Sequence, residues 1–150
     1  MSQYKRIKLI CDACCKIPNA NIKGRLNKGK AACGIILLDE AEQSIIQKGK
    51  YLGELTTPQA EYNGLIFGLD LAAGYCRNEI EVWMDSELVI RQMNGEYGIK
   101  SDNMKPLFDE VKRLERRFKI EPKYFHHNRT AKLAKLADKV ANDEFLLRSN

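Results

Sequence analysis

A short polar turn, Asp39 to Gln43, separates two long segments of apolar and β-compatible residues. Ala31 to Leu38 precedes the turn and Ser44 to Leu55 follows it, and a further apolar segment, Tyr4 to Cys15, comes before both. We interpret all three segments as strands. Because so short a turn can join only antiparallel strands, the first part of the chain predicts an antiparallel meander.

Helical and strand patterns alternate in the rest of the chain. Thr57-Pro58 predicts an N-cap followed by proline at the first helical position, and apolar residues then recur at three- and four-residue steps as far as Cys76. Glu79 to Asp85 alternates with the period of a strand. The remaining predicted elements are a short helix at Ser86 to Met93, a helix at Pro106 to Phe118, a strand at Ile120 to His126 and a helix at Thr130 to Leu147. This order predicts an α/β fold with a mixed sheet flanked by helices.

Length and composition predict one globular domain over residues 1–150, with 44% hydrophobic and 30% charged residues. No apolar stretch approaches the roughly 20 residues of a membrane span, and the N-terminus lacks the apolar segment of a secretory signal. We therefore expect a cytoplasmic protein without membrane association, and a monomer. The formal charge of +5 has the sign that suits a polyanionic partner.

The five cysteines favour reduced thiols over a disulfide framework, because their number is odd and most lie in apolar runs. Cys11 and Cys14 form a single Cys-x-x-Cys pair. Residues three apart on a strand point to opposite faces, so core packing is favoured over a zinc or redox site.

Basic residues concentrate between the first two predicted strands, where no acid interrupts them. They are Lys16, Lys23, Arg25, Lys28 and Lys30. Such a segment could steer nucleic acid towards the protein.

Asp12 stands inside an apolar run, Ile7 to Cys15, where an unpaired carboxylate is costly unless a proton, a partner or a metal neutralises it. Three further acids lie where a side chain could reach the edge of the sheet: Glu61 one turn into the first long helix, Asp85 at the end of the fourth strand, and Asp138 on the last helix. Four such acids brought together would repel, and divalent cations with hard oxygen ligands, Mg²⁺ or Mn²⁺, are the natural compensation. Two such ions can drive phosphodiester hydrolysis.

The sequences around these acids resemble, in order, the four active-site motifs of type 1 ribonuclease H. They are Cys11-Asp12-Ala13, Pro58 to Ile66 around Glu61, Val82 to Val89 around Asp85, and Leu136 to Asn142 around Asp138. The resemblance implies a five-stranded mixed sheet and two Mg²⁺ ions held by Asp12, Glu61, Asp85 and Asp138. It also implies endonucleolytic cleavage of the RNA strand of RNA–DNA hybrids, leaving 3′-hydroxyl and 5′-phosphate ends.

Several positions depart from the family pattern. Ala13 replaces the usual glycine after the first aspartate, and Thr57-Pro58 replaces the paired asparagines that commonly open the first long helix. The resemblance leaves Ala13, Cys14, Thr57, Gln59 and Asn94 as candidate substrate contacts. The chain also lacks the basic protrusion of some bacterial members and resembles the shorter subtype.

Many members carry a histidine before the last aspartate that assists product departure. His126 and His127 lie 12 and 11 residues before Asp138. We assign the role to His127. Two alternatives stay open: that His126 has this role, or that both histidines only end the strand.

Two other functions remain open. One is a related nuclease such as a 3′–5′ exonuclease, whose first motif typically carries a second acid where this chain has Cys14. The other is a non-catalytic domain that binds RNA or hybrids, although such a domain has no reason to keep four metal-ligating acids.

Overall fold

The computed structural model describes residues 4–18, 27–128 and 131–148. Its described part contains five strands and four helices in the predicted order. They are β1 (Arg6–Lys16), β2 (Gly29–Leu38), β3 (Ser44–Leu55), α1 (Thr57–Ala73), β4 (Glu79–Met84), α2 (Glu87–Met93), α3 (Lys105–Glu115), β5 (Lys123–His126) and α4 (Lys132–Arg148).

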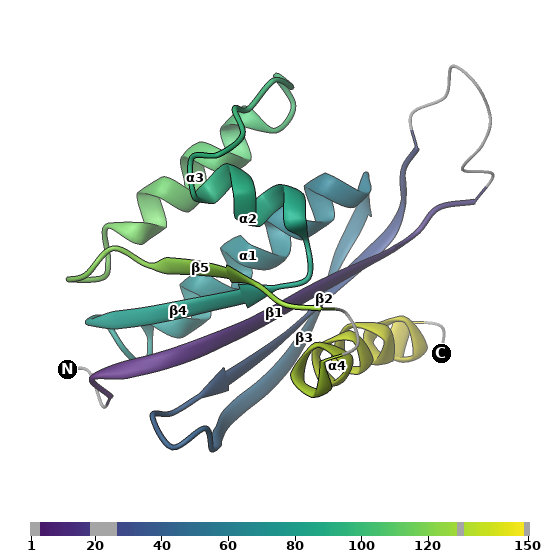
Figure 1. The fold of residues 1–150 in the computed structure, drawn as a ribbon. Helices are drawn as coiled ribbons and strands as arrows, with labels where there is room; N and C mark the ends of the chain where they lie inside the picture. Colours follow the sequence, from purple (N-terminus) through teal and green to yellow (C-terminus); the bar gives the residue numbers. More distant parts are fainter. Residues whose placement is uncertain (1–3, 19–26, 129–130, 149–150) are drawn as a thin grey trace.

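The five strands form one mixed sheet in the order β3-β2-β1-β4-β5 (Figure 1). β1 pairs antiparallel with β2, and β2 with β3, so the predicted meander is confirmed. β4 adds to the other side of β1 in parallel, and β5 to β4 in parallel. The central strand β1 therefore has an antiparallel and a parallel neighbour, and the fold class predicted from the sequence is confirmed.

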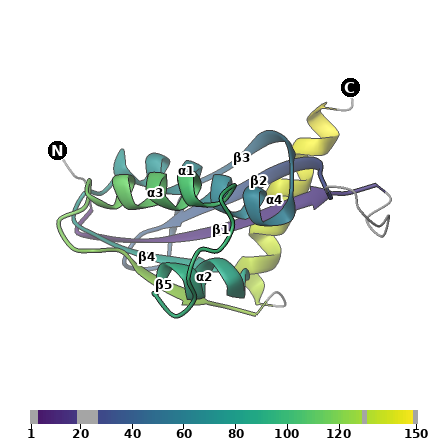
Figure 2. The same ribbon diagram turned by 90° about the horizontal axis from the view of Figure 1, so that it is seen from above.

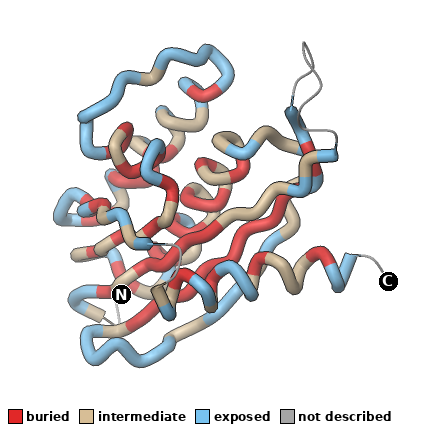
Figure 3. Tube along the Cα trace, turned by 45° about the vertical axis from the view of Figure 1, so that its right-hand side comes forward, coloured by how far each residue is buried: buried red, intermediate tan, exposed pale blue. Residues whose placement is uncertain are grey.

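Helices cover both faces of the sheet. α1 packs against β1, β2 and β3 on one face and also contacts α3, whereas α4 packs against the same three strands on the other face. Figure 2 shows α1 and α3 side by side, with α4 crossing the sheet separately. The larger core, which includes Leu9, Ile35 and Leu65, lies on the α1 face, and a smaller one around Ile10 and Ile36 lies under α4. Figure 3 shows the buried residues concentrated along the central strands.

The first long helix begins one residue earlier than predicted. Thr56, not Thr57, is the N-cap: its hydroxyl accepts a hydrogen bond from the Gln59 amide, and the Gln59 side chain accepts one from the Thr56 amide in return. This capping box satisfies two amides that the helix leaves without partners. Pro58 still lies in the first turn, but the assignment of Thr57 as N-cap is wrong.

The other differences lie at element ends. α1 ends at Ala73 with Gly74 as its C-cap, so Cys76 lies beyond the helix. α3 ends at Glu115, a turn and bends follow over residues 116–120, and Pro122 lies directly before β5, which starts at Lys123. The predicted start of the last helix, Thr130, lies outside the described residues, as do Lys23 and Arg25. Within the described ranges, no helix has the length and apolarity that crossing a membrane requires.

Candidate active site

Asp12 is the most buried of the four predicted carboxylates, with 5% of its surface exposed. Burial first, and then the charge of Asp85, raises the pKa of Asp12 to about 9. The side chains of both Asp138 and Asp85 are close enough to hydrogen-bond with it, and these contacts raise its pKa further. Two acids from other parts of the chain, Asp85 and Asp138, thus meet around the buried carboxyl group of Asp12.

The parallel pairing of β1 and β4 explains the position of Asp85. The last register pair of the two strands joins Cys11 to Met84, so the next residues are Asp12 and Asp85. Ser86 then accepts a hydrogen bond from the Val89 amide at 3.3 Å and starts α2 at once. Asp85 is therefore held between the end of a strand and the start of a helix.

Close packing of α4 on the sheet explains the position of Asp138. A Cβ added to Gly34 of β2 would lie 2.1 Å from the carbonyl oxygen of Ala137 and 2.7 Å from the amide nitrogen of Ala141. Asn142, one turn further along α4, donates a hydrogen bond to Oδ1 of Asp138 at 3.1 Å and another to its carbonyl oxygen at 2.9 Å. The bare backbone at Gly34 lets the helix approach, and Asn142 orients the carboxylate.

Glu61 reaches the same region from the opposite face of the sheet. A Cβ added to Gly64, one turn further along α1, would lie 3.3 Å from Sγ of Cys11, so the helix runs close to β1. Burial is the main cause that raises the pKa of Cys11 well above its usual value, and the charges of Asp12, Glu61 and Asp85 add to it. Glu61 therefore lies near enough to Cys11 to act on its thiol, whereas the acids that raise the pKa of Asp12 are Asp85 and Asp138.

The acids have the chemistry of divalent-cation ligands, but their side chains are not arranged as a complete coordination site. Within the described ranges, no three His, Cys, Asp or Glu side chains already stand in a metal-binding arrangement. Their carboxylate oxygens are nevertheless hard ligands of the type that Mg²⁺ and Mn²⁺ prefer. The raised pKa of Asp12 also marks a concentration of negative charge that a bound cation would relieve.

The two histidines occupy different surroundings. Nε2 of His126 lies 3.2 Å from the carbonyl oxygen of Asp85. The His127 amide donates to the carbonyl of Met84, and its ring lies beside Trp83 with the centroids 6.3 Å apart. Nε2 of His127 is buried without a hydrogen-bond partner among the described residues, and burial lowers the pKa of this ring although Asp85 opposes the shift. Both rings are close to Asp85, so the assignment to His127 stays a prediction.

The candidate substrate contacts are only partly gathered around the carboxylates. Cys14 is half-buried beside them, and burial followed by the charges of Asp12 and Asp138 raises its pKa to about 12. Ala13 faces α1, where a Cβ on Gly64 would lie 3.7 Å from its own Cβ.

The other three candidates lie at the beginnings and ends of helices. Thr57 is exposed at the start of α1, and its side chain lies near the thiol of Cys15. The Gln59 side chain is engaged in the capping box. Nδ2 of the Asn94 side chain donates to the carbonyl of Tyr124 at 3.2 Å, so this side chain turns towards β5.

A hollow of about 740 Å³ beside the start of α1 was not predicted from the sequence. Thr56 and Gln59 line it from α1, together with Leu88, Tyr97 and Asn103 from α2 and the residues that follow. Leu88 and Tyr97 are 41% and 48% exposed, which is unusual for large apolar side chains. They line this groove because α2 and the residues after it lie beside α1. The periodicity of the sequence does not reveal that arrangement.

The chain matches known proteins over most of its length. The family model described as reverse transcriptase-like matches residues 21–144. The bifunctional protein Rv2228c of Mycobacterium tuberculosis is 32% identical over 121 residues, which cover 79% of this chain and 32% of that protein. Ribonuclease HI of Halobacterium salinarum is 33% identical over 81 residues, covering 54% of this chain and 41% of that protein. The chain thus spans about a third of the mycobacterial relative and less than half of the archaeal one.

Solved structures give the same result. RNase H1 from Halobacterium salinarum superimposes with a TM-score of 0.80 at 26% identity, covering 93% of this chain and 97% of that one. LC11-RNase H1 in complex with an RNA/DNA hybrid superimposes with a TM-score of 0.75 at 28% identity, covering 93% and 99%. Together with the family match, these likenesses confirm the resemblance found in the sequence: the chain belongs to the reverse transcriptase-like family of ribonuclease H-like domains and has the fold of ribonuclease H1.

Proposed function

We propose that the protein is a ribonuclease H that hydrolyses the RNA strand of RNA–DNA hybrids internally and leaves 3′-hydroxyl and 5′-phosphate ends. The observation that carries the proposal is the meeting of Asp85 and Asp138 around the buried Asp12, from three elements far apart in the sequence. The solved complex of LC11-RNase H1 with an RNA/DNA hybrid supports the choice of substrate.

In this proposal Asp12, Glu61, Asp85 and Asp138 hold divalent cations, two with substrate bound, and Mg²⁺ is the physiological ion with Mn²⁺ as a substitute. The ions supply the positive charge that activates a water and stabilises the charge developing on the scissile phosphate. Asp12 contributes a carboxylate fixed within the sheet, and Asn142 keeps that of Asp138 in orientation. No side chain forms a covalent bond to the substrate.

The hybrid is recognised by shape and by its 2′-hydroxyls, which a protein can reach across the wide minor groove of an A-form-like duplex. Thr57, Gln59 and Asn94, with Ala13 and Cys14 beside the carboxylates, are the proposed substrate contacts, and His127 is the proposed aid to product release. We place the protein in the cytoplasm as a monomer, away from membranes. Its five free cysteines are consistent with a reducing compartment.

The test is cleavage of an end-labelled hybrid, run beside double-stranded RNA, double-stranded DNA and single-stranded RNA, with Mg²⁺, Mn²⁺ or chelator. Internal cuts confined to the RNA of the hybrid and abolished by chelator are expected. A ladder that shortens from one end would instead indicate an exonuclease. Hybrid binding without cleavage in either metal would indicate a non-catalytic binding domain.

A further inference from the structure

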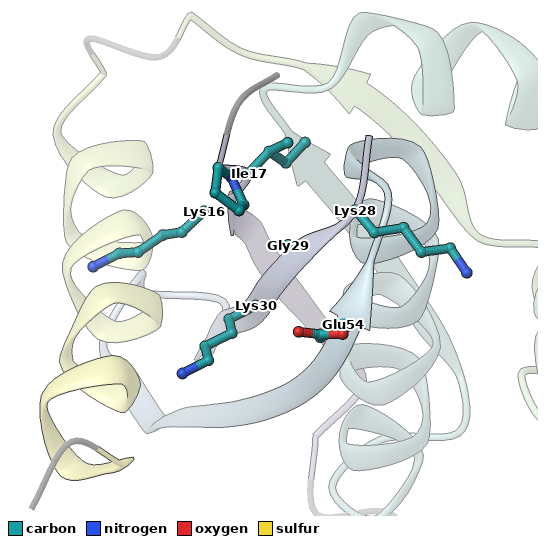
Figure 4. Close-up of a pocket in the computed structure, with 7 residues that line it drawn as sticks. Lys16, Ile17, Lys28, Gly29, Lys30 and Glu54 are labelled. Atoms are coloured by element: carbon teal, nitrogen blue, oxygen red, sulfur yellow. The ribbon is translucent and has the colours of Figure 1, made fainter. Parts of the chain in front are cut away.

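Three lysines surround the end of the β1–β2 pair, and we call them the basic fork: Lys16, Lys28 and Lys30. They line a hollow of about 500 Å³ together with Glu54, the one acid among its lining residues. All three are exposed. Figure 4 shows Lys16 and Lys30 directed to the side of α4 and Lys28 to the opposite side.

The charge of the fork is only partly compensated. Lys16 lies directly opposite Lys30 in the β1–β2 register, and like charges in that position destabilise a strand pair. Glu54 pairs with Lys30 from β3, which leaves three lysines against one carboxylate. The ammonium of Lys16 lies 4.5 Å from the centre of the Phe145 ring on α4, a contact that fixes the side chain without neutralising it. An anion would relieve this repulsion.

The backbone that carries the fork is held firmly. A Cβ added to Gly29 would lie 1.9 Å from the carbonyl oxygen of Lys16, so the two strands are in close contact here. The thiol of Cys15 donates to the carbonyl of Leu55 at 3.1 Å and lies 3.6 Å from that of Gly29. Leu55 ends β3 directly before the N-cap Thr56, so the first of these contacts ties the fork to the start of α1. The backbone that carries the fork is therefore fixed relative to the carboxylates, while the lysine side chains themselves are exposed.

The distance between the basic fork and the carboxylates matches the spacing of phosphates along a duplex. Lys16 follows Asp12 by four residues on β1, which places it on the same face about 13 Å further along. A nucleic-acid duplex carries about one charge per 1.7 Å of its axis, so a duplex seated on the carboxylates presents further phosphates at this distance. Building on the proposed function, we infer that the basic fork binds backbone phosphates of the hybrid several nucleotides from the cleaved bond.

The test is the salt dependence of hybrid binding, measured by fluorescence anisotropy in chelator so that no cleavage occurs. Each phosphate contact contributes about one to the slope of log K against log salt. The triple variant Lys16→Gln, Lys28→Gln, Lys30→Gln should lower that slope by about 2 to 3 and weaken binding roughly 10-fold or more at low salt. Thermal melting should show that it folds, because neutralising the Lys16–Lys30 repulsion does not destabilise the strand pair.

The matched control is Lys48→Gln, Lys119→Gln, Lys123→Gln, which removes the same charge from exposed positions outside the fork. Its slope should stay within about one of the unaltered protein. Equal losses in both variants, or no change in the fork variant, would overturn the inference. Cleavage by the unaltered protein, measured in parallel with Mg²⁺, tests the proposed function separately, since binding in chelator does not depend on it.

Discussion

Gly34 on β2 lies directly opposite Asp12 on β1, and α4 packs its backbone directly against the same glycine. One residue without a side chain therefore sets both the surroundings of Asp12 and the distance to Asp138. Small residues on the helix, Ala137 and Ala141, complete the contact. The site depends on this close approach as much as on the acids themselves.

Replacing Gly34 with alanine should impair both stability and cleavage. The new methyl group would overlap the backbone of α4, so the helix must shift, at a cost of about 1–3 kcal/mol. For a chain of this size that corresponds to a fall in Tm of roughly 2–10 °C. Because the shift carries Asp138 away from Asp12, kcat should fall more than hybrid affinity.

Gly74→Ala is the matched control, since Gly74 is the C-cap of α1 with ordinary helical backbone angles. Its added Cβ would meet only the Leu71 carbonyl, at 3.3 Å. Normal kcat in Gly34→Ala at a temperature where it is folded would show that the close approach does not position Asp138.

Without metal, the contribution of Asp12 to the stability of the protein should fall as pH rises between about 4 and about 9. The pKa of Asp12 is about 9 in the folded protein against an ordinary value of 3.8. In that range the unfolded chain releases its proton while the folded protein keeps it, so ionisation favours unfolding. Asp12→Asn removes this effect and should raise the Tm of the metal-free protein at about pH 8 by at least ~2 °C.

Calorimetric melting in chelator at several pH values measures this effect. Asp102→Asn, at an exposed position, is the control and should leave the pH profile unchanged. A metal-free Asp12→Asn protein no more stable than the unaltered one at alkaline pH would contradict the environment assigned to Asp12.

The sequence predicted the order of the elements, because that order depends on local patterns, whereas the four acids were assigned through the resemblance of the motifs around them to a known family. Alternation in Glu79–Met84 and the apolar steps of α1 are visible in any stretch of a few residues. The sequence did not predict that Thr56 caps α1, because the adjacent Thr56 and Thr57 carry the same hydroxyl group. The structure distinguishes them, since Thr56 is the threonine that forms the capping box with Gln59.

Contacts between segments far apart in the sequence could not be predicted either. Nothing near Gly34 indicates that α4 packs on it, and nothing near Cys15 indicates its bond to Leu55. The convergence of Asp12 with Asp138 likewise needed the resemblance to a family, since 126 positions separate them and no periodicity spans that distance.

Two aspartates on α4 should respond differently to the same substitution. Asp138→Asn removes a carboxylate beside Asp12, so we expect cleavage and Mn²⁺ affinity to fall by roughly 10–100-fold or more. Asp143→Asn removes an exposed partner of Lys139, whose ion pair at 2.8 Å contributes little to stability. It should leave cleavage unchanged.

Isothermal titration with Mn²⁺ and a cleavage time course distinguish the two. Similar losses of cleavage and Mn²⁺ affinity in both variants would mean that these depend on the integrity of α4 and not on the Asp138 carboxylate. A fully active Asp138→Asn protein would remove Asp138 from the proposed site.

The role assigned to His127 can be separated from that of His126 by comparing single and multiple turnovers. If His127 assists product release, His127→Ala should slow the multiple-turnover rate while leaving single-turnover cleavage close to normal.

The ring is largely neutral at pH 7, because burial lowers its pKa below the ordinary 6.5, so its contribution should grow as pH falls towards 6. In the part of the chain that the structure describes, the buried Nε2 has no partner, so His127→Phe should be at least as stable as the native protein and serve as a well-folded second variant. A defect found in His126→Ala instead would transfer the role to the ring that contacts the Asp85 carbonyl.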